Sequence, residues 1–388
     1  MKNNYSFIIF SLIALVSISC KHEIENYSYQ RLSIHPDESI NVELKDLFDI
    51  ENITPLETND SVLINAIYNI LYEERHFYIL DRKAASVFIY KDNGEIENVI
   101  HSIGNGPEEY NELTGVNFDP FHQQLHLFDN VKKKEYIYSD LGEFIRVDSI
   151  PFKIDQKIFL NHTHYVIARS PMDINGGFRV NFYDTNGLTA QYCYFKYVNG
   201  ATINDWSFPI LPIKENIYNH ISFNDTIYRF NAERLKGGYI VDFGKFAIPK
   251  EIKECSLDNR LFKFVDYLQA QNYKVARSHF LFKEDDDHVY ISYVYALNNH
   301  FYIYDKHTKD GTSFCGPFIG NMPLTDILYG TFNSNGKLLF VLDKSKYDEI
   351  GEKHKQEICN NYPSIYAALE ESAIDDNPII VTVSIRNI

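Results

Sequence analysis

The chain has 388 residues, 45% of them hydrophobic, and carries a net charge of −16 at pH 7. This length and composition exclude a disordered chain, and the acidic balance argues against nucleic-acid binding, which requires a basic surface. Aromatic residues reach 15%, with 29 Tyr and 28 Phe. That content favours strands, whose pleated faces pack flat rings.

Residues 7–18 form the only long apolar run, behind Met1 and Lys2 and before Ser-Ile-Ser-Cys at residues 17–20. A run this short, ending in small residues, is typical of a secretory signal and not of a membrane span. Its end at Cys20 resembles the lipobox of bacterial lipoproteins, with Ser17 in place of the usual Leu. The resemblance implies a signal peptide over residues 1–19 and lipidation of Cys20. The chain would then be attached to a membrane of the cell envelope by lipid alone, on the periplasmic or outer-surface side. The alternative is an unmodified Cys20 beside an ordinary cleavage site.

Residues 20–40 are polar with few apolar anchors, and they predict a tether between the lipid and a domain over residues 41–388. Within that domain, pairs of strand-like runs alternate with turns. Two units align at Tyr90, Asp92 and Gly94 and at Tyr138, Asp140 and Gly142, and less regular units occupy residues 164–187, 220–230, 288–311 and 326–342. Gly and Asn in such turns supply the positive φ that tight hairpins need.

About six units of this kind recur every 40 to 70 residues, which is the size of a four-stranded propeller blade with insertions. The period-two pattern without long amphipathic helices excludes a doubly wound α/β sheet. The prediction is an all-β, six-bladed β-propeller with short helical insertions, closed by its N- and C-terminal strands. Specifically, residues 382–385 should build the last blade together with a strand from about residues 40–58.

Two insertions have helical patterns. Ser256 is the predicted N-cap of a helix with Leu261, Phe264, Val265 and Leu268 on one face. Ser345 with Asp348 predicts a capping box at the start of a helix that runs toward residue 359, and residues 364–371 predict a further short helix.

Residues 103–110, Ile-Gly-Asn-Gly-Pro-Glu-Glu-Tyr, resemble the GxGPGEY segment of the six-bladed β-propeller lipoproteins of Bacteroidota, with Glu108 in place of Gly. Segments 54–58, 223–228 and 377–380 also agree with that family, so the resemblance covers nearly the whole mature chain. It implies the fold and the location but no particular reaction. Independently of the family, Gly104 and Gly106 allow backbone angles that other residues avoid, and Pro107 stiffens the exit of the segment.

Glu108, Glu109 and Tyr110 have two interpretations. They are loop residues that fix the crossing between two blades, or they are binding residues at the rim of a ligand-binding face. The run Glu284-Asp285-Asp286-Asp287-His288 is dense in acids, but it lacks the alternating ligands and the glycine of a calcium loop, so it predicts a solvated hairpin turn.

His162 and His164 point the same way on a strand and need a further ligand to hold zinc, which nothing local supplies. His220, His279, His288 and His300 are scattered. No hydrolase, metalloprotease or phosphate-loop motif occurs, so we assign no catalytic residue, no metal and no cofactor.

Four cysteines remain in the mature chain: Cys193, Cys255, Cys315 and Cys359. Their irregular spacing favours free, mostly buried thiols, although four cysteines also allow three disulfide connectivities. Ser61, Ser149 and Thr226 lie in three-residue sequences that look like O-glycosylation sites of exported proteins in the same bacterial group.

These observations together predict a lipid-anchored binding protein of the cell envelope. Its ligand, expected at the mouth of the central channel, is a glycan, a peptide or a partner envelope protein. Two alternatives remain open. One is a propeller lyase or hydrolase that uses histidines and acids of the channel, and the other is a scaffold within an envelope complex.

Overall fold

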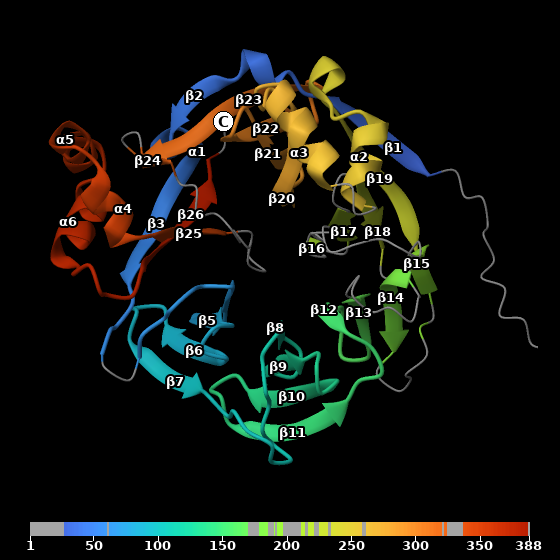
Figure 1. Cartoon of the computed structure of the whole chain (residues 1–388), viewed down its shortest axis with the longest axis vertical. Coiled ribbons are helices and arrows are strands. Elements are labelled where there is room, and N and C mark those ends of the chain that lie inside the picture. The colour runs from blue at the N-terminus through green and yellow to red at the C-terminus, as the bar shows by residue number, and fades with distance from the viewer. Residues whose placement is uncertain are drawn as a thin grey trace, which may run out of the picture.

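The computed structural model describes residues 27–59, 62–169, 178–184, 190, 192–196, 211–213, 216–220, 225–231, 234–257, 261–319, 322–323 and 337–386. These residues form six sheets arranged in a ring (Figure 1). The predicted six-bladed, all-β propeller is therefore confirmed. The ring follows the order of the chain, with each blade beside the next.

The first three blades are four-stranded antiparallel sheets whose strands neighbour one another in chain order. Blade 1 contains β4 (Asn69–Glu73), β5 (His76–Asp81), β6 (Ser86–Lys91) and β7 (Ile96–Ile100). Blade 2 contains β8 (Gly115–Asp119), β9 (Gln124–Asp129), β10 (Lys134–Ser139) and β11 (Phe144–Ser149). Blade 3 contains β12 (Ile154–Phe159), β13 (His164–Arg169), β14 (Phe178–Asp184) and β15 (Tyr192–Lys196). In Figure 1 the first strand of blade 2 lies inside the ring and its last strand lies outside.

The other three blades recruit strands from the N-terminal part of the chain. Blade 4 contains β16 (Leu211–Ile213), β17 (Asn216–His220), β18 (Thr226–Phe230), β19 (Leu235–Asp242) and, from the N-terminus, β1 (Ser28–Ser33). Blade 5 contains β20 (Ala276–Glu284), β21 (His288–Tyr295), β22 (Asn298–Asp305), β23 (Asp310–Ile319), β24 (Met322–Pro323) and β2 (Ile40–Glu43). The described part of blade 6 contains β25 (Leu338–Leu342), β26 (Ile379–Ile385) and β3 (Phe48–Pro55).

The middle strands of the blades are buried on both faces, because each sheet packs between two neighbouring sheets. The β5 and β6 strands are almost completely buried, and Tyr78 and Ile89 share one core cluster with Val116 and Leu127 of blade 2. The aligned turns after β6 and β10 contain Gly94 at φ +88° and Gly142 at φ +86°. Both glycines thus have the positive φ that the sequence pattern predicts.

The ring closes through the two ends of the domain. Strand β26 pairs antiparallel with β3, with Thr382 opposite Asn52 and Ile385 opposite Phe48. This pairing confirms the predicted closure. Among the described strands of the last blade, one therefore comes from the start of the domain and two come from its end.

The predicted tether over residues 20–40 is wrong from Ser28 onward, and residues 20–26 lie outside the described residues. Strand β1 pairs in parallel with β19, and β2 pairs in parallel with β23. The physical reason is a small number of well-placed apolar residues: Leu32 and Ile34 are 0% and 1% exposed in a core cluster shared by blades 4 and 5. The 3-10 turn η1 (Pro36–Glu38) separates the two strands.

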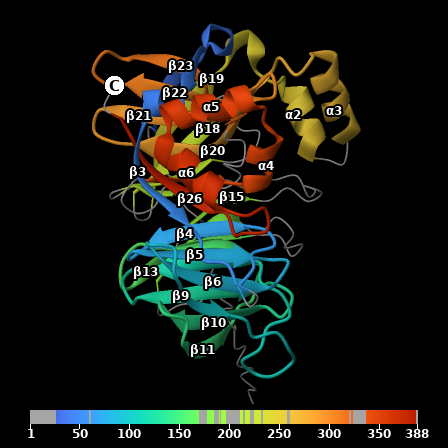
Figure 2. The same ribbon diagram turned by 90° about the vertical axis from the view of Figure 1, so that its left-hand side faces the viewer.

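The C-terminal helices, over residues 344–371, lie at the outside of the ring in Figure 1, and Figure 2 shows α2 and α3 as a pair that projects from one face of the ring. The 3-10 turn η2 (Gly244–Phe246) precedes α2 (Lys250–Leu257) and α3 (Leu261–Ala270). Phe264 and Leu268 are buried as predicted, but Val265 is exposed. Ser256 lies inside α2, so its prediction as an N-cap is wrong.

The remaining helices are α1 (Leu44–Leu47), α4 (Lys344–Glu349), α5 (Glu352–Asn361) and α6 (Pro363–Glu371). The single helix predicted toward residue 359 is in fact two, α4 and α5, with a break at Ile350 and Gly351. The N-cap is Asp343 and not Ser345, because the Asp343 carboxylate accepts hydrogen bonds from the backbone and hydroxyl of Ser345. The short helix predicted at 364–371 is confirmed as α6.

Cys193, Cys315 and Cys359 are not in disulfide bonds, and Cys315 is buried while the other two are partly buried. The side chain of Cys255 lies outside the described residues.

Candidate functional site

The segment from Gly104 to Tyr110 connects β7 of blade 1 to β8 of blade 2. Tyr110 has no exposed surface, and its hydroxyl accepts a hydrogen bond from Ser102 N at 2.9 Å and donates to Ile100 O at 3.3 Å. Burial raises the pKa of Tyr110 well above its ordinary value. The prediction that Tyr110 contacts a ligand at an exposed rim is therefore wrong, because its ring is a core residue between two blades.

Glu109 also serves the loop itself. Its Oε2 accepts a hydrogen bond from Gly106 N at 2.7 Å, and a Cβ atom at Gly104 would lie 1.9 Å from the same oxygen. Lys132 of blade 2 donates from Nζ to the carbonyl oxygens of Gly104 and Glu109, at 2.7 and 3.0 Å. The geometry matches the loop interpretation for Glu109, whereas Glu108 is exposed and its binding role stays a prediction.

The acidic run at residues 284–288 is a hairpin turn between β20 and β21. Asp285 Oδ1 accepts hydrogen bonds from the backbone N–H groups of Asp287 and His288, at 2.9 and 2.7 Å. Glu284 forms an ion pair with Lys306 Nζ at 2.6 Å. Asp285 and Glu284 therefore have a structural role: Asp285 stabilises the turn, and Glu284 pairs with a nearby lysine.

The predicted histidine sites are dispersed. His164 contacts Asn161 and Thr163, and the ring of His162 lies 5.4 Å from that of His122. The Nδ1 atom of His300 lies 3.0 Å from Ser39 Oγ. Within the part of the chain that the structure describes, no three His, Cys, Asp or Glu side chains are grouped closely enough to hold a metal ion. The side chains of His220 and His279 lie outside that part.

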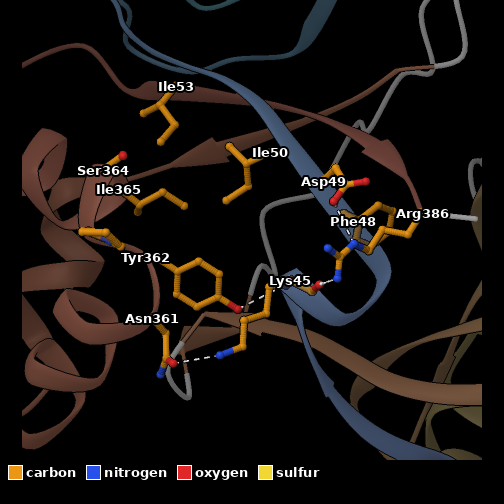
Figure 3. Close-up of a pocket in the computed structure, with 11 residues that line it drawn as sticks. Lys45, Phe48, Asp49, Ile50, Ile53, Asn361, Tyr362, Ser364, Ile365 and Arg386 are labelled. Atoms are coloured by element: carbon orange, nitrogen blue, oxygen red, sulfur yellow. Dashed lines mark hydrogen bonds and ion pairs between the residues drawn. The ribbon is translucent and has the colours of Figure 1, made fainter. Parts of the chain in front are cut away.

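A pocket of about 300 Å³ lies beside blade 6, where the N-terminal and C-terminal parts of the domain meet (Figure 3). Helix α1 and the start of β3 form one wall, and the end of α5 and the start of α6 form the other. The lining residues are Lys45, Phe48, Asp49, Ile50, Ile53, Asn361, Tyr362, Pro363, Ser364, Ile365 and Arg386.

The base of the pocket is apolar and belongs to the core of blade 6. Phe48 is 3% exposed and Ile365 is 0% exposed, and Ile50 and Ile53 pack against the same core cluster. Because these side chains are packed in the core, the pocket keeps its shape without a ligand. Binding then costs less conformational entropy of the protein.

Tyr362 joins the two walls. Its ring is 4% exposed, and its hydroxyl accepts a hydrogen bond from Lys45 N at 3.2 Å and donates to Glu43 Oε2 at 3.1 Å. Burial is the main reason why the pKa of Tyr362 is raised far above its ordinary value. The phenol therefore stays neutral and holds α1 against the loop between α5 and α6.

Two cations stand at the mouth of the pocket. Lys45 Nζ donates to Asn361 Oδ1 at 2.8 Å and lies 5.9 Å from the centre of the Tyr362 ring. Arg386 donates from Nε to Asp49 Oδ1 and from Nη1 to Lys45 O, both at 2.7 Å. An ammonium has three N–H donors and a guanidinium has five, so both groups keep donors that a ligand can use.

The pocket can accept a small molecule with an apolar body and an anionic end. The isoleucines and Phe48 would cover the body, and Lys45 and Arg386 would donate charge-assisted hydrogen bonds to the anion. Sequence reasoning missed this site because more than 300 residues separate Lys45 from Tyr362 and Arg386. The one local signal was the pair of helical insertions before the last strand. The site predicted at the channel mouth stays a prediction.

Among the described residues, no helix combines the length and the hydropathy required to cross a bilayer.

No curated protein matches this sequence. Among solved structures, a protein from Bacteroides fragilis NCTC 9343 described as exported is 18% identical, with a TM-score of 0.70 over 93% of this chain and 100% of its own. A member of the DUF4221 family from Bacteroides vulgatus ATCC 8482 is 11% identical, with a TM-score of 0.53 over 88% of this chain and 98% of its own. These similarities establish a common fold. The family described as "Domain of unknown function (DUF4934)" matches residues 32–384, and the chain therefore belongs to the DUF4934 family.

Proposed function

We propose that this protein is a lipid-anchored, extracytoplasmic binding protein of the bacterial cell envelope. Its pocket between α1, β3 and α6 binds a small carboxylate with an apolar body. A peptide end that has an apolar side chain and a carboxylate is one example. The pocket carries the binding proposal, since it combines an apolar, preformed base with two cations at its mouth. The proposed location rests on the signal-like N-terminus and Cys20. It is supported by the Bacteroides fragilis neighbour, which is described as exported.

The anchor is tested by the intact mass of the protein extracted from native membranes in detergent. We expect a chain that begins at Cys20 and has the added mass of a diacylglyceryl group and an N-acyl chain. The Cys20→Ser variant should lose these groups and leave the membrane fraction. A native chain that begins elsewhere, or that has an unmodified Cys20, would contradict the anchor.

Ligand binding is tested by NMR with isoleucine δ1-methyl labelling. Titration with sodium hexanoate should shift the methyl signals of Ile50, Ile53 and Ile365, whereas Ile137 of blade 2 and Ile167 of blade 3 should stay fixed. Hexanamide is the matched probe without charge, and it should bind about tenfold more weakly, which corresponds to about 1.4 kcal/mol.

Two variants separate the contribution of the cations to binding from that of the apolar base of the pocket. Arg386→Gln and Lys45→Gln should each weaken hexanoate about three- to tenfold and leave the weak binding of hexanamide unchanged. Equal affinities for acid and amide, or shifts that are as large at Ile137 as at Ile365, would contradict the proposed ligand class.

A further inference from the structure

The position at which β1 begins is fixed by glycines in blade 4. Strand β1 pairs with β19 from Ser28 opposite Gly237 to Ser33 opposite Asp242. Gly237 and Gly238 have φ of +126° and +139°, and a Cβ atom at Gly237 would lie 1.9 Å from Ser28 O. Only glycine gives this close backbone approach, so the first residues of β1 have a defined place on the outside of the ring (Figure 1).

Six residues, Lys21 to Asn26, separate Cys20 from Tyr27. Even a fully extended chain spans at most about 25 Å over this interval. A compact domain of this size has a radius of gyration of about 21 Å and hence a diameter of about 50 Å. The inference that follows rests on the proposed lipid anchor. If the lipid on Cys20 is inserted in the bilayer, the side of the propeller where β1 begins has to face the membrane.

Three tyrosines gather at this point. The rings of Tyr27 and Tyr29 lie edge to face with centroids 6.5 Å apart, and Tyr29 has the same relation to Tyr228 at 6.5 Å. Gly238 is the register partner of both Tyr29 and Tyr228, so the two rings meet above a position without a side chain. Tyr27 is 37% exposed. Tyrosine rings with an apolar body and a polar tip favour the interface between lipid and water.

Basic residues adjoin the tyrosines. Lys236 directly precedes Gly237, and Arg234 lies just before β19 begins; both side chains are exposed. The whole chain is strongly acidic, so most of its surface is repelled by anionic lipid. A local pair of cations beside the anchor would favour one orientation, with Arg234 and Lys236 near the lipid phosphates.

We propose that Tyr27, Tyr29, Tyr228, Arg234 and Lys236 form a patch that rests on the bilayer surface and orients the propeller. The lipid chains supply the attachment, the short chain after Cys20 brings this side of the ring to the membrane, and the patch holds that side against the bilayer surface. Helices α5 and α6 and strand β3, which line the pocket, lie on a different part of the ring from β1 (Figure 1). The pocket should therefore stay open to ligand in this orientation.

The experiment uses the acylated full chain, with its lipid verified by intact mass, reconstituted into vesicles of phosphatidylethanolamine and phosphatidylglycerol. Acetylation by an amine-reactive reagent is followed at Lys236 and at Lys83, which is exposed on blade 1, far around the ring. Compared with the Cys20→Ser chain free in solution, Lys236 should react at least about fivefold more slowly in vesicles. The rate at Lys83 should change less than twofold.

The variant Tyr27→Ser with Arg234→Gln keeps the lipid and should remove most of the protection at Lys236. Tyr68→Ser is the matched control, because Tyr68 is also 37% exposed but lies in blade 1. Equal rates at Lys236 and Lys83 in an acylated sample would overturn the patch and leave the anchor intact. Protection of Lys236 in native envelopes but not in vesicles would also overturn it, in favour of a protein partner. If the native chain is not acylated, that result contradicts the lipid anchor of the proposed function and not the patch.

Discussion

At the scale of single residues, three ionisable side chains form a buried cluster between blades 2 and 3. Glu135 Oε1 lies 2.7 Å from Lys157 Nζ and 2.6 Å from His126 Nδ1, and all three residues are less than 9% exposed. Burial alone would raise the pKa of Glu135. The charge of Lys157 and the hydrogen bond from His126 outweigh burial and lower that pKa to about 2.

A lowered pKa in the folded state makes this cluster sensitive to acid. The ionised Glu135 contributes its full stabilisation above the carboxyl's unfolded pKa, and that contribution is lost as the pH falls through the range from about 4.5 to 2. We expect the free energy of unfolding, measured by urea denaturation, to fall across this range. In the double variant Glu135→Gln with Lys157→Met, the fall should be smaller, and an identical pH profile would contradict the assignment.

The single variant Lys157→Met leaves the Glu135 carboxylate buried without its strongest partner. We expect a loss of about 3–5 kcal/mol of stability at pH 7, since an unpaired buried charge is costly. The double variant Glu135→Gln with Lys157→Met should recover part of this loss, because it removes both charges. Urea denaturation of the two variants side by side measures the difference.

At the scale of elements, the N-terminal strands act as covers for the outer edges of blades 4 and 5. Strands β1 and β2 pair in parallel with β19 and β23, which would otherwise end their sheets as unpaired edges. Exposed edges promote pairing between molecules, so these strands also protect the protein against aggregation.

The glycine at position 237 decides whether β1 can dock. Gly237→Ala should strain the backbone at φ +126° and collide with Ser28 O, which costs about 2 kcal/mol or more. The expected result is faster hydrogen exchange in residues 28–33, while β5 and β6 of blade 1 stay protected. Gly351→Ala is the control, because no atom lies within 4 Å of its added Cβ and residues 28–33 should exchange as before. Unchanged exchange at 28–33 in Gly237→Ala would contradict this role.

At the scale of the whole molecule, one pairing closes the ring. Strand β26 lies between β25 and β3, so it joins the end of the domain to its beginning. Ile380, Val381 and Val383 of this strand are completely buried. Loss of β26 would expose two sheet edges and open the core of the last blade.

Two truncated chains test this closure. A chain that ends at Asn377 lacks β26 and should fail to give a cooperative thermal transition. A chain that begins at His35 lacks β1 but keeps β26 and β3, so it should stay folded with a lower melting temperature, because it no longer buries Leu32 and Ile34. Far-UV circular dichroism and calorimetry distinguish the two, and a cooperative transition in the chain without β26 would contradict the closure.

Local patterns in the sequence were sufficient for the blades. The alternation of strand residues, the aligned turns at Gly94 and Gly142, and the apolar run at 379–385 gave six sheets and a closed ring, because these signals depend on neighbours along the chain. The helical insertion before the last strand was recognised in the same way. The exact helix starts were not, since Asp343 competed with Ser345 as a cap and backbone geometry decided between them.

Sequence by itself therefore determined the fold class, the number of blades and the strands that close the ring. Only the tertiary structure decided that residues 28–43 belong to blades 4 and 5, that Tyr110 is a core residue, and that Lys45, Tyr362 and Arg386 share a pocket. The reason is physical: a strand such as β1 with one buried residue, Leu32, or a pocket assembled from the two ends of the domain, leaves no periodic trace in the chain. Such features depend on long-range contacts that exist only after the ring has closed.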